Sequence, residues 1–88
     1  MQQKDSNNGE LFAIQSLGWI LEDSSRASRL LGLTGLTPEA LRAGLGDRAM
    51  LAAVLAFLEA HEPDLTACAG AIGVAPADLV AARRSLEV

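Results

Sequence analysis

The sequence predicts an all-α protein, a compact bundle of five to six short helices with an internal pseudo-twofold repeat of helix-turn-helix units. Apolar residues recur with the helical period, no segment alternates with the strand period over a useful length, and glycine and proline separate the periodic segments. The 88 residues, half of them apolar, leave room for one hydrophobic core.

The first periodic segment runs from residue 10 to residue 23 and follows a polar stretch, residues 1–8, that we expect to be a disordered tail. Either Asn7 or Asn8 can supply the N-cap of this helix. Five of its residues form one stripe that we expect to face the core and that Ala13 and Ile20 widen: Leu11, Ile14, Leu17, Gly18 and Leu21.

Turn signals then delimit two shorter helices. Asp23 or Ser24 can cap a helix that extends through Leu31, and Gly35 suits its end because glycine adopts the left-handed conformation without steric cost. Thr37-Pro38-Glu39 restarts the chain as a helix, with Leu41 and Leu45 expected to face inward. The glycines at 44 and 46 end this helix, and Asp47 caps the next.

Residues 50–61 form the most apolar segment of the chain. A helix that is apolar on nearly every face is normally central in its fold. Pro63-Asp64 opens a fifth helix, which Gly73 ends, and Ala75-Pro76 opens a sixth.

An internal repeat underlies this order of elements. Residues 35–43 align without gaps on residues 73–81, and the same offset of 38 places Leu17 on Leu55 and Trp19 on Phe57. We therefore predict a single helical domain over residues 9–88, with repeat one at about 10–46 and repeat two at about 48–86. The long helices of the two units are expected to pair about a pseudo-twofold axis. The alternative is that glycine-proline turns recur here by chance.

Charge and composition argue against several classes of protein. The net charge of −4 repels phosphate backbones unless the few arginines gather in one place. The N-terminal residues lack the apolar core of a signal peptide, and the longest apolar run, residues 49–58, is too short to cross a bilayer. A single cysteine provides no internal disulfide. We therefore expect a cytoplasmic protein that does not bind membranes.

The sequence offers little material for catalysis. His61 is the only histidine, and Cys68 lies among alanines, as a small buried hydrophobic residue would. The carboxylates are scattered over helix ends, and no glycine-rich phosphate loop is present. We expect no catalytic residue, no metal site and no cofactor, so the chain is not predicted to be an enzyme.

Phe12 and Trp19 are candidates for contact with a protein partner. They are seven residues apart on a helix face that also carries polar residues, away from the leucine stripe. Either they belong to the core or they form a contact surface. The leading hypothesis is a non-enzymatic helical interaction module that binds an unknown protein or a second copy of itself, as a homodimer.

A helix-turn-helix protein that binds nucleic acid is the alternative hypothesis. The glycine turns at 35 and 73 each join two predicted helices, which is the arrangement of many DNA-binding proteins. Arg42 and Arg84 would contact the nucleic acid. The acidic residues Glu39 and Asp78, near the start of each recognition helix, argue against this partner because they repel phosphates.

The chain resembles an uncharacterised bacterial family, domain of unknown function 3572. The resemblance rests on residues 33–38, Leu-Thr-Gly-Leu-Thr-Pro, on the apolar segment 51–58, and on the second glycine-to-proline turn, residues 73–76. It covers about residues 10–86. It implies a small helical bacterial protein and brings no activity or functional residues with it.

Overall fold

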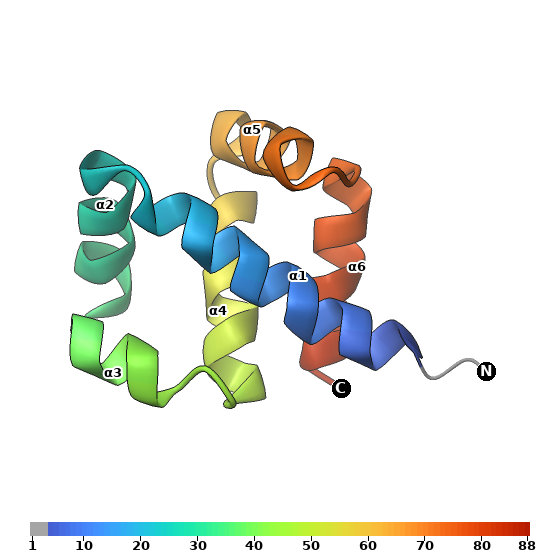
Figure 1. Cartoon of the computed structure of the whole chain (residues 1–88), viewed down its shortest axis with the longest axis horizontal. Helices are drawn as coiled ribbons and strands as arrows, with labels where there is room; N and C mark the ends of the chain where they lie inside the picture. Colours follow the sequence, from blue (N-terminus) through green and yellow to red (C-terminus); the bar gives the residue numbers. More distant parts are fainter. Residues whose placement is uncertain (1–3) are drawn as a thin grey trace.

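The computed structural model describes the backbone of residues 4–88 and the side chains of residues 8–88, and within this part the chain forms six helices and no strand (Figure 1). The all-α prediction is confirmed. The helices are α1 (Lys4–Leu21), α2 (Ser24–Thr34), α3 (Pro38–Ala43), α4 (Arg48–Glu59), α5 (Glu62–Ile72) and α6 (Pro76–Leu86). The predicted disordered tail overlaps α1 at residues 4–8, and its first three residues lie outside the described residues.

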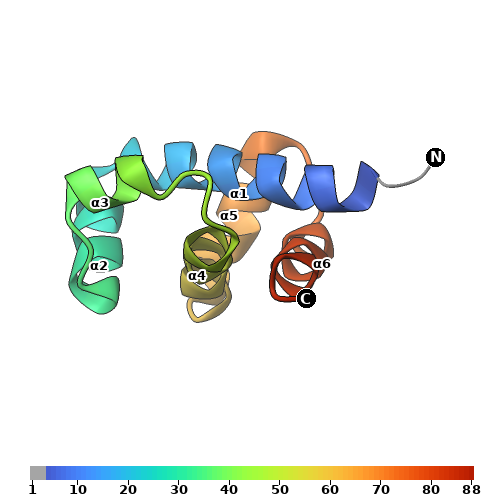
Figure 2. The same cartoon turned by 90° about the horizontal axis from the view of Figure 1, so that it is seen from below.

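The helices form two layers. Helix α1 runs along the molecule and crosses in front of α4, and α3 lies in the same layer at one end of the molecule (Figures 1 and 2). Helices α2, α4 and α6 lie beneath (Figure 2). The molecule measures 38 × 26 × 18 Å, so its outer α1/α3 side is one of the two broad faces.

The predicted helix ends are confirmed at four turns. The side chains of Asp23, Thr37 and Asp47 each accept a hydrogen bond from a backbone N–H group in the first turn of α2, α3 and α4. Gly35 and Gly73 end α2 and α5 with φ angles of 73° and 82°, in the left-handed region that favours glycine. At the start of α1 the prediction was wrong: the helix begins at Lys4, so Asn7 and Asn8 lie inside it and not at its N-cap position.

Helix α4 is central, as its apolar character predicts. It packs against α1, α2, α5 and α6, and seven of its twelve residues are buried. Leu55 and Leu58 are fully buried there, and Leu30, Cys68 and Leu79 bring α2, α5 and α6 into the same core.

The prediction for the buried face of α1 was wrong for most of the expected stripe. Leu17 is buried, but Leu11, Ile14, Gly18 and Leu21 are exposed. The face that meets the core carries the smaller residues Gly9, Ala13 and Ser16 together with Leu17 and Ile20. Small side chains allow neighbouring helices to approach closely, and this close approach decides which face of α1 is buried.

The crossing of α1 and α6 shows this close approach most directly. These two helices form the most extensive helix pair in the fold. A Cβ atom added at Gly9 would lie 2.7 Å from Ser85 Oγ and 3.3 Å from the carbonyl oxygen of Ala82. A methyl group at residue 9 would therefore require the Ser85 hydroxyl to move and would crowd the backbone of α6 at Ala82.

The helix boundaries follow the offset of 38, whereas the packing of the two units differs. Helix α5 begins and ends 38 residues after α2 does. Helices α3 and α6 begin at prolines with the same offset, Pro38 and Pro76. Helix α6 packs extensively against α1 and α4, but the shorter α3 ends at Gly44 and makes no comparable contact among the described residues. The duplication stays a prediction from the sequence.

Candidate protein-interaction surface

An apolar stripe lies on the outer side of α1. It consists of Leu11, Ile14, Gly18 and Leu21, which share one helix face because they are three or four residues apart. Leu11, Ile14 and Leu21 are 50%, 42% and 47% exposed. Helix α1 therefore carries apolar residues on two opposite sides, and only one side is covered by the rest of the domain.

Gly18 lies in the middle of this apolar stripe, on its open side. No atom outside its own helix segment lies within 4 Å of a Cβ atom placed there. Its φ angle is not positive, so the backbone does not require glycine. Glycine inside a helix costs about 1 kcal/mol relative to alanine. Nothing within the described part of the chain explains that cost.

A small hollow adjoins the Leu21 end of the apolar stripe. This α1/α3 hollow has a volume of about 140 Å³, close to the ~150 Å³ of an apolar cavity that can hold a benzene-sized group. Its lining is apolar except for one guanidinium group: Leu17, Leu21, Leu31, Pro38, Leu41, Arg42 and Leu45. Leu41 is buried as predicted, but Leu45 is 36% exposed at the rim instead of facing inward.

Charged groups lie along one edge of the apolar stripe. Glu10, seven residues before Leu17 and on the same edge of α1, pairs with Arg48 at 3.4 Å, and both side chains are about half exposed. Arg48 also donates a hydrogen bond to the Ser85 carbonyl oxygen. Arg42, at the other end of this edge, forms no ion pair with the described side chains. The two ends of the edge thus differ in charge.

Phe12 and Trp19, the partner contacts predicted from the sequence, lie outside the apolar stripe. Both are partly buried and pack against the core. Phe12 lines an open groove between α1 and α6, and the Arg26 guanidinium lies 3.6 Å from the centre of the Trp19 ring. Their role in partner binding stays a prediction, and part of each side chain is covered by contacts within the domain.

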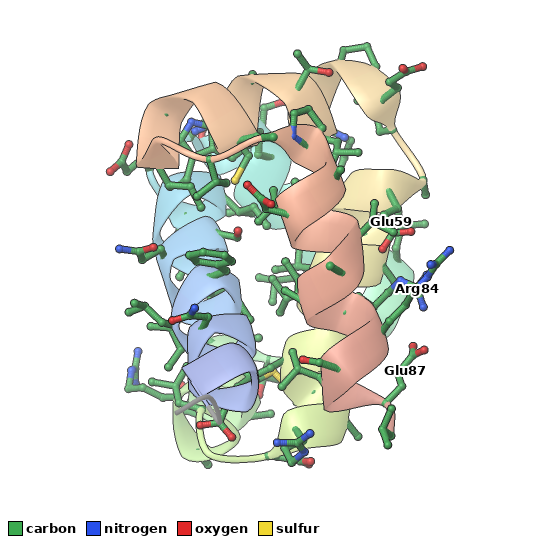
Figure 3. The ribbon with its side chains drawn as sticks, turned by 90° about the vertical axis from the view of Figure 1, so that its right-hand side faces the viewer. Glu59, Arg84 and Glu87 are labelled. Atoms are coloured by element: carbon green, nitrogen blue, oxygen red, sulfur yellow. The ribbon has the colours of Figure 1, made fainter. Side chains whose placement is uncertain are left out.

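The two arginines of the nucleic-acid hypothesis are far apart. Arg42 is on α3 and Arg84 on α6, at opposite ends of the long axis (Figure 1). Figure 3 shows that Arg84 shares its side of the molecule with Glu59 and Glu87. Both acidic side chains bind the neighbouring Arg83, whose pKa they raise. The structure does not bring Arg42 and Arg84 together into one basic patch.

The groups considered for catalysis are separate. Cys68 is buried beside Ser16, and burial raises the pKa of its thiol while the nearby hydroxyl and Arg26 oppose this shift. The Ser16 hydroxyl has no hydrogen-bond partner of good geometry among the described residues. His61 is exposed at the N-cap of α5, where its side chain caps nothing. No three metal-ligating side chains cluster in the described part of the chain.

Between residues 4 and 88, none of the helices is by itself both long and apolar enough to cross a membrane. Helices α5 and α6 together reach the required length and composition, but they are bent by 97° at their junction.

Comparison with known proteins identifies one family. The model of the family described as "Protein of unknown function (DUF3572)" matches residues 6–88, nearly the whole chain. No match was found among curated proteins or among solved structures. The resemblance noted from the sequence is confirmed.

Proposed function

The chain belongs to the DUF3572 family of proteins of unknown function, and we propose that it is a non-enzymatic module that binds another protein chain through the apolar stripe on α1. The observation that carries this proposal is the exposure of Leu11, Ile14 and Leu21 on one helix face. Exposed apolar residues that adjoin one another often mark an interaction site, whereas single exposed apolar side chains are common on any protein surface.

The stripe has the composition of an interface centre. Complete burial of one leucine or isoleucine side chain contributes about 1.5–3 kcal/mol. Since the three side chains are about half exposed, covering them contributes on the order of 3 kcal/mol before the cost of association. The adjoining α1/α3 hollow adds a site for one large apolar side chain of the partner. Arg42 at its rim favours a partner with a carboxylate nearby.

Site-specific photo-crosslinking in living cells tests the proposal. A photo-reactive phenylalanine analogue replaces Ile14, and the same analogue at Ala71, an exposed position on α5, serves as the control. We expect a crosslinked product of defined mass from position 14 and none from position 71. Equal labelling at both positions, or no product at either, refutes the proposed surface.

The helix-turn-helix alternative has one geometric observation in its favour. The 97° bend between α5 and α6 falls in the range of about 90–120° found in such motifs. Against it, Asp78 at the start of α6 accepts a hydrogen bond from the Ala75 N–H group and presents a negative charge where phosphates would bind. We expect no binding to mixed duplex DNA even at about 20 mM salt, where electrostatic attraction is strongest. Salt-sensitive binding that Arg84→Gln weakens would instead support the alternative.

A further inference from the structure

Building on the proposed function, we infer that the partner on the apolar stripe is a second copy of this chain, with the two α1 helices packed antiparallel about a twofold axis. Homodimers with twofold symmetry use the same patch on both subunits, so such a patch must be complementary to itself. The order of residues along the apolar stripe meets this condition.

The stripe is complementary when it is reversed. Leu11 and Leu21 are equally far from its midpoint, and so are Ile14 and Gly18. In an antiparallel pair, Leu11 of each copy therefore lies opposite Leu21 of the other, and Ile14 lies opposite Gly18. The branched side chain of Ile14 would then occupy the space that Gly18 leaves open. This packing would explain why glycine, which destabilises a helix, stands at residue 18.

The hollow and the charges fit the same arrangement. The twofold axis of this arrangement lies in the contact plane and is perpendicular to α1. It places the same edge of the apolar stripe from both copies on one side of the interface, with the Leu11 end of one copy beside the Leu21 end of the other. Leu11 of one copy then packs against Leu21 of the other, and Leu21 lines the α1/α3 hollow. The same operation brings Glu10, one residue before Leu11, toward Arg42 at the rim of that hollow. Glu10 would then bind Arg48 of its own copy and Arg42 of the second copy.

The face that carries the stripe is large enough for a stable dimer. It extends over the two longer dimensions of the molecule, 38 and 26 Å, and it includes both α1 and α3 (Figure 2). Standard interfaces remove about 800 Å² of surface from each partner, which is within the area of this face. A contact confined to α1 would be smaller, so the dimer includes α3 and the segment after it.

Sedimentation or light scattering, with the concentration varied from micromolar to millimolar, tests the inference. We expect the wild-type mass to rise toward twice the 9.2 kDa of one chain. Gly18→Lys is expected to remain at 9.2 kDa throughout, since its side chain blocks the space for Ile14 of the second copy. Lysine at this open position also favours the helix, so the urea midpoint of the variant should be no lower than that of the wild type.

Gly70→Lys is the matched control. Gly70 is likewise exposed within a helix, with no atom within 4 Å of an added Cβ, but it lies on α5 away from the stripe. We expect this variant to dimerise like the wild type. Loss of the dimer in both lysine variants overturns the inference, as does a dimer that persists in Gly18→Lys.

A charge exchange tests the antiparallel arrangement. Glu10→Lys and Arg42→Glu should each weaken the dimer, by about 2- to 5-fold for a partly exposed pair. The double variant should restore it, because the opposite charges meet again across the interface. Additive losses in the double variant overturn the arrangement.

The failure of this inference is distinct from failure of the proposed function. A wild-type chain that stays at 9.2 kDa at millimolar concentration overturns the dimer. Crosslinking from Ile14 to a different protein would then still support the proposed interaction surface. Absence of any crosslink from Ile14, in a chain that is also monomeric, overturns both.

Discussion

Two glycines of α1 should respond in opposite ways to the same substitution. Gly9 is buried against α6, and Gly18 is open to solvent. Alanine is favoured over glycine inside a helix by about 1 kcal/mol. Gly18→Ala should therefore stabilise the monomer by about that amount, because nothing meets the added methyl group.

At residue 9 the same gain is opposed by crowding. The added Cβ would lie 2.7 Å from Ser85 Oγ and 3.3 Å from the Ala82 carbonyl oxygen. Overpacking of this kind typically costs about 1–3 kcal/mol, so Gly9→Ala should range from neutral to about 2 kcal/mol less stable than the wild type. The difference between the two alanine variants is then about 1–3 kcal/mol.

Urea unfolding followed by far-ultraviolet circular dichroism measures this difference. With a slope of about 1 kcal/mol per molar for a small domain, the two midpoints should differ by about 1–3 M. Low micromolar protein keeps association from adding to the stability. Ser85→Ala in the Gly9→Ala background should recover part of the loss, since it removes the closest atom. Equal stabilisation by Gly9→Ala and Gly18→Ala would refute the close crossing of α1 and α6.

Three further predictions concern the core. Leu55→Ala should lower the free energy of unfolding by about 2–5 kcal/mol, measured in urea, because Leu55 is fully buried on the central helix. Arg26→Gln should cost about 1 kcal/mol and raise the acrylamide quenching of Trp19 fluorescence, because it removes the guanidinium stacked on the ring; unchanged quenching would contradict this contact. Burial raises the pKa of the Cys68 thiol in the folded chain. Above about pH 8.5 the unfolded chain therefore loses the thiol proton before the folded chain does, and the free energy of unfolding of the wild type falls by up to about 1.4 kcal/mol per pH unit. Cys68→Ala should lack this component, and parallel urea titrations of both proteins over that pH range measure it.

Turns were predictable because their determinants are local. Asp23, Thr37 and Asp47 act on backbone N–H groups within three residues, and Gly35 and Gly73 relieve a steric conflict within one residue. Sequence alone therefore predicts where these helices begin and end. The start of α1 lacks such a signal, and there the prediction was several residues late.

The orientation of α1 was not predictable from the size of its apolar residues. A stripe of large apolar side chains normally faces the core. Helix α1 carries apolar residues on two opposite faces, and the buried one is the face with Gly9, Ala13 and Ser16. Those three residues are separated by four and three positions, and this spacing of small residues was the signal for a close helix crossing. The candidate surface follows from that choice, because the burial of one face leaves Leu11, Ile14 and Leu21 outside.

The pairing of α1 with α6 also determines the order in which the fold can be completed. The first helix of the chain finds its most extensive contact on the last one, so the core cannot close until α6 has left the ribosome. Until then, the part of α1 that α6 covers is open to water and to other chains, although α1 can already pack against α2, α4 and α5. The nascent chain must therefore avoid aggregation with its longest helix only partly covered. Contacts so distant in sequence should also slow its folding relative to helical domains built from neighbouring helices.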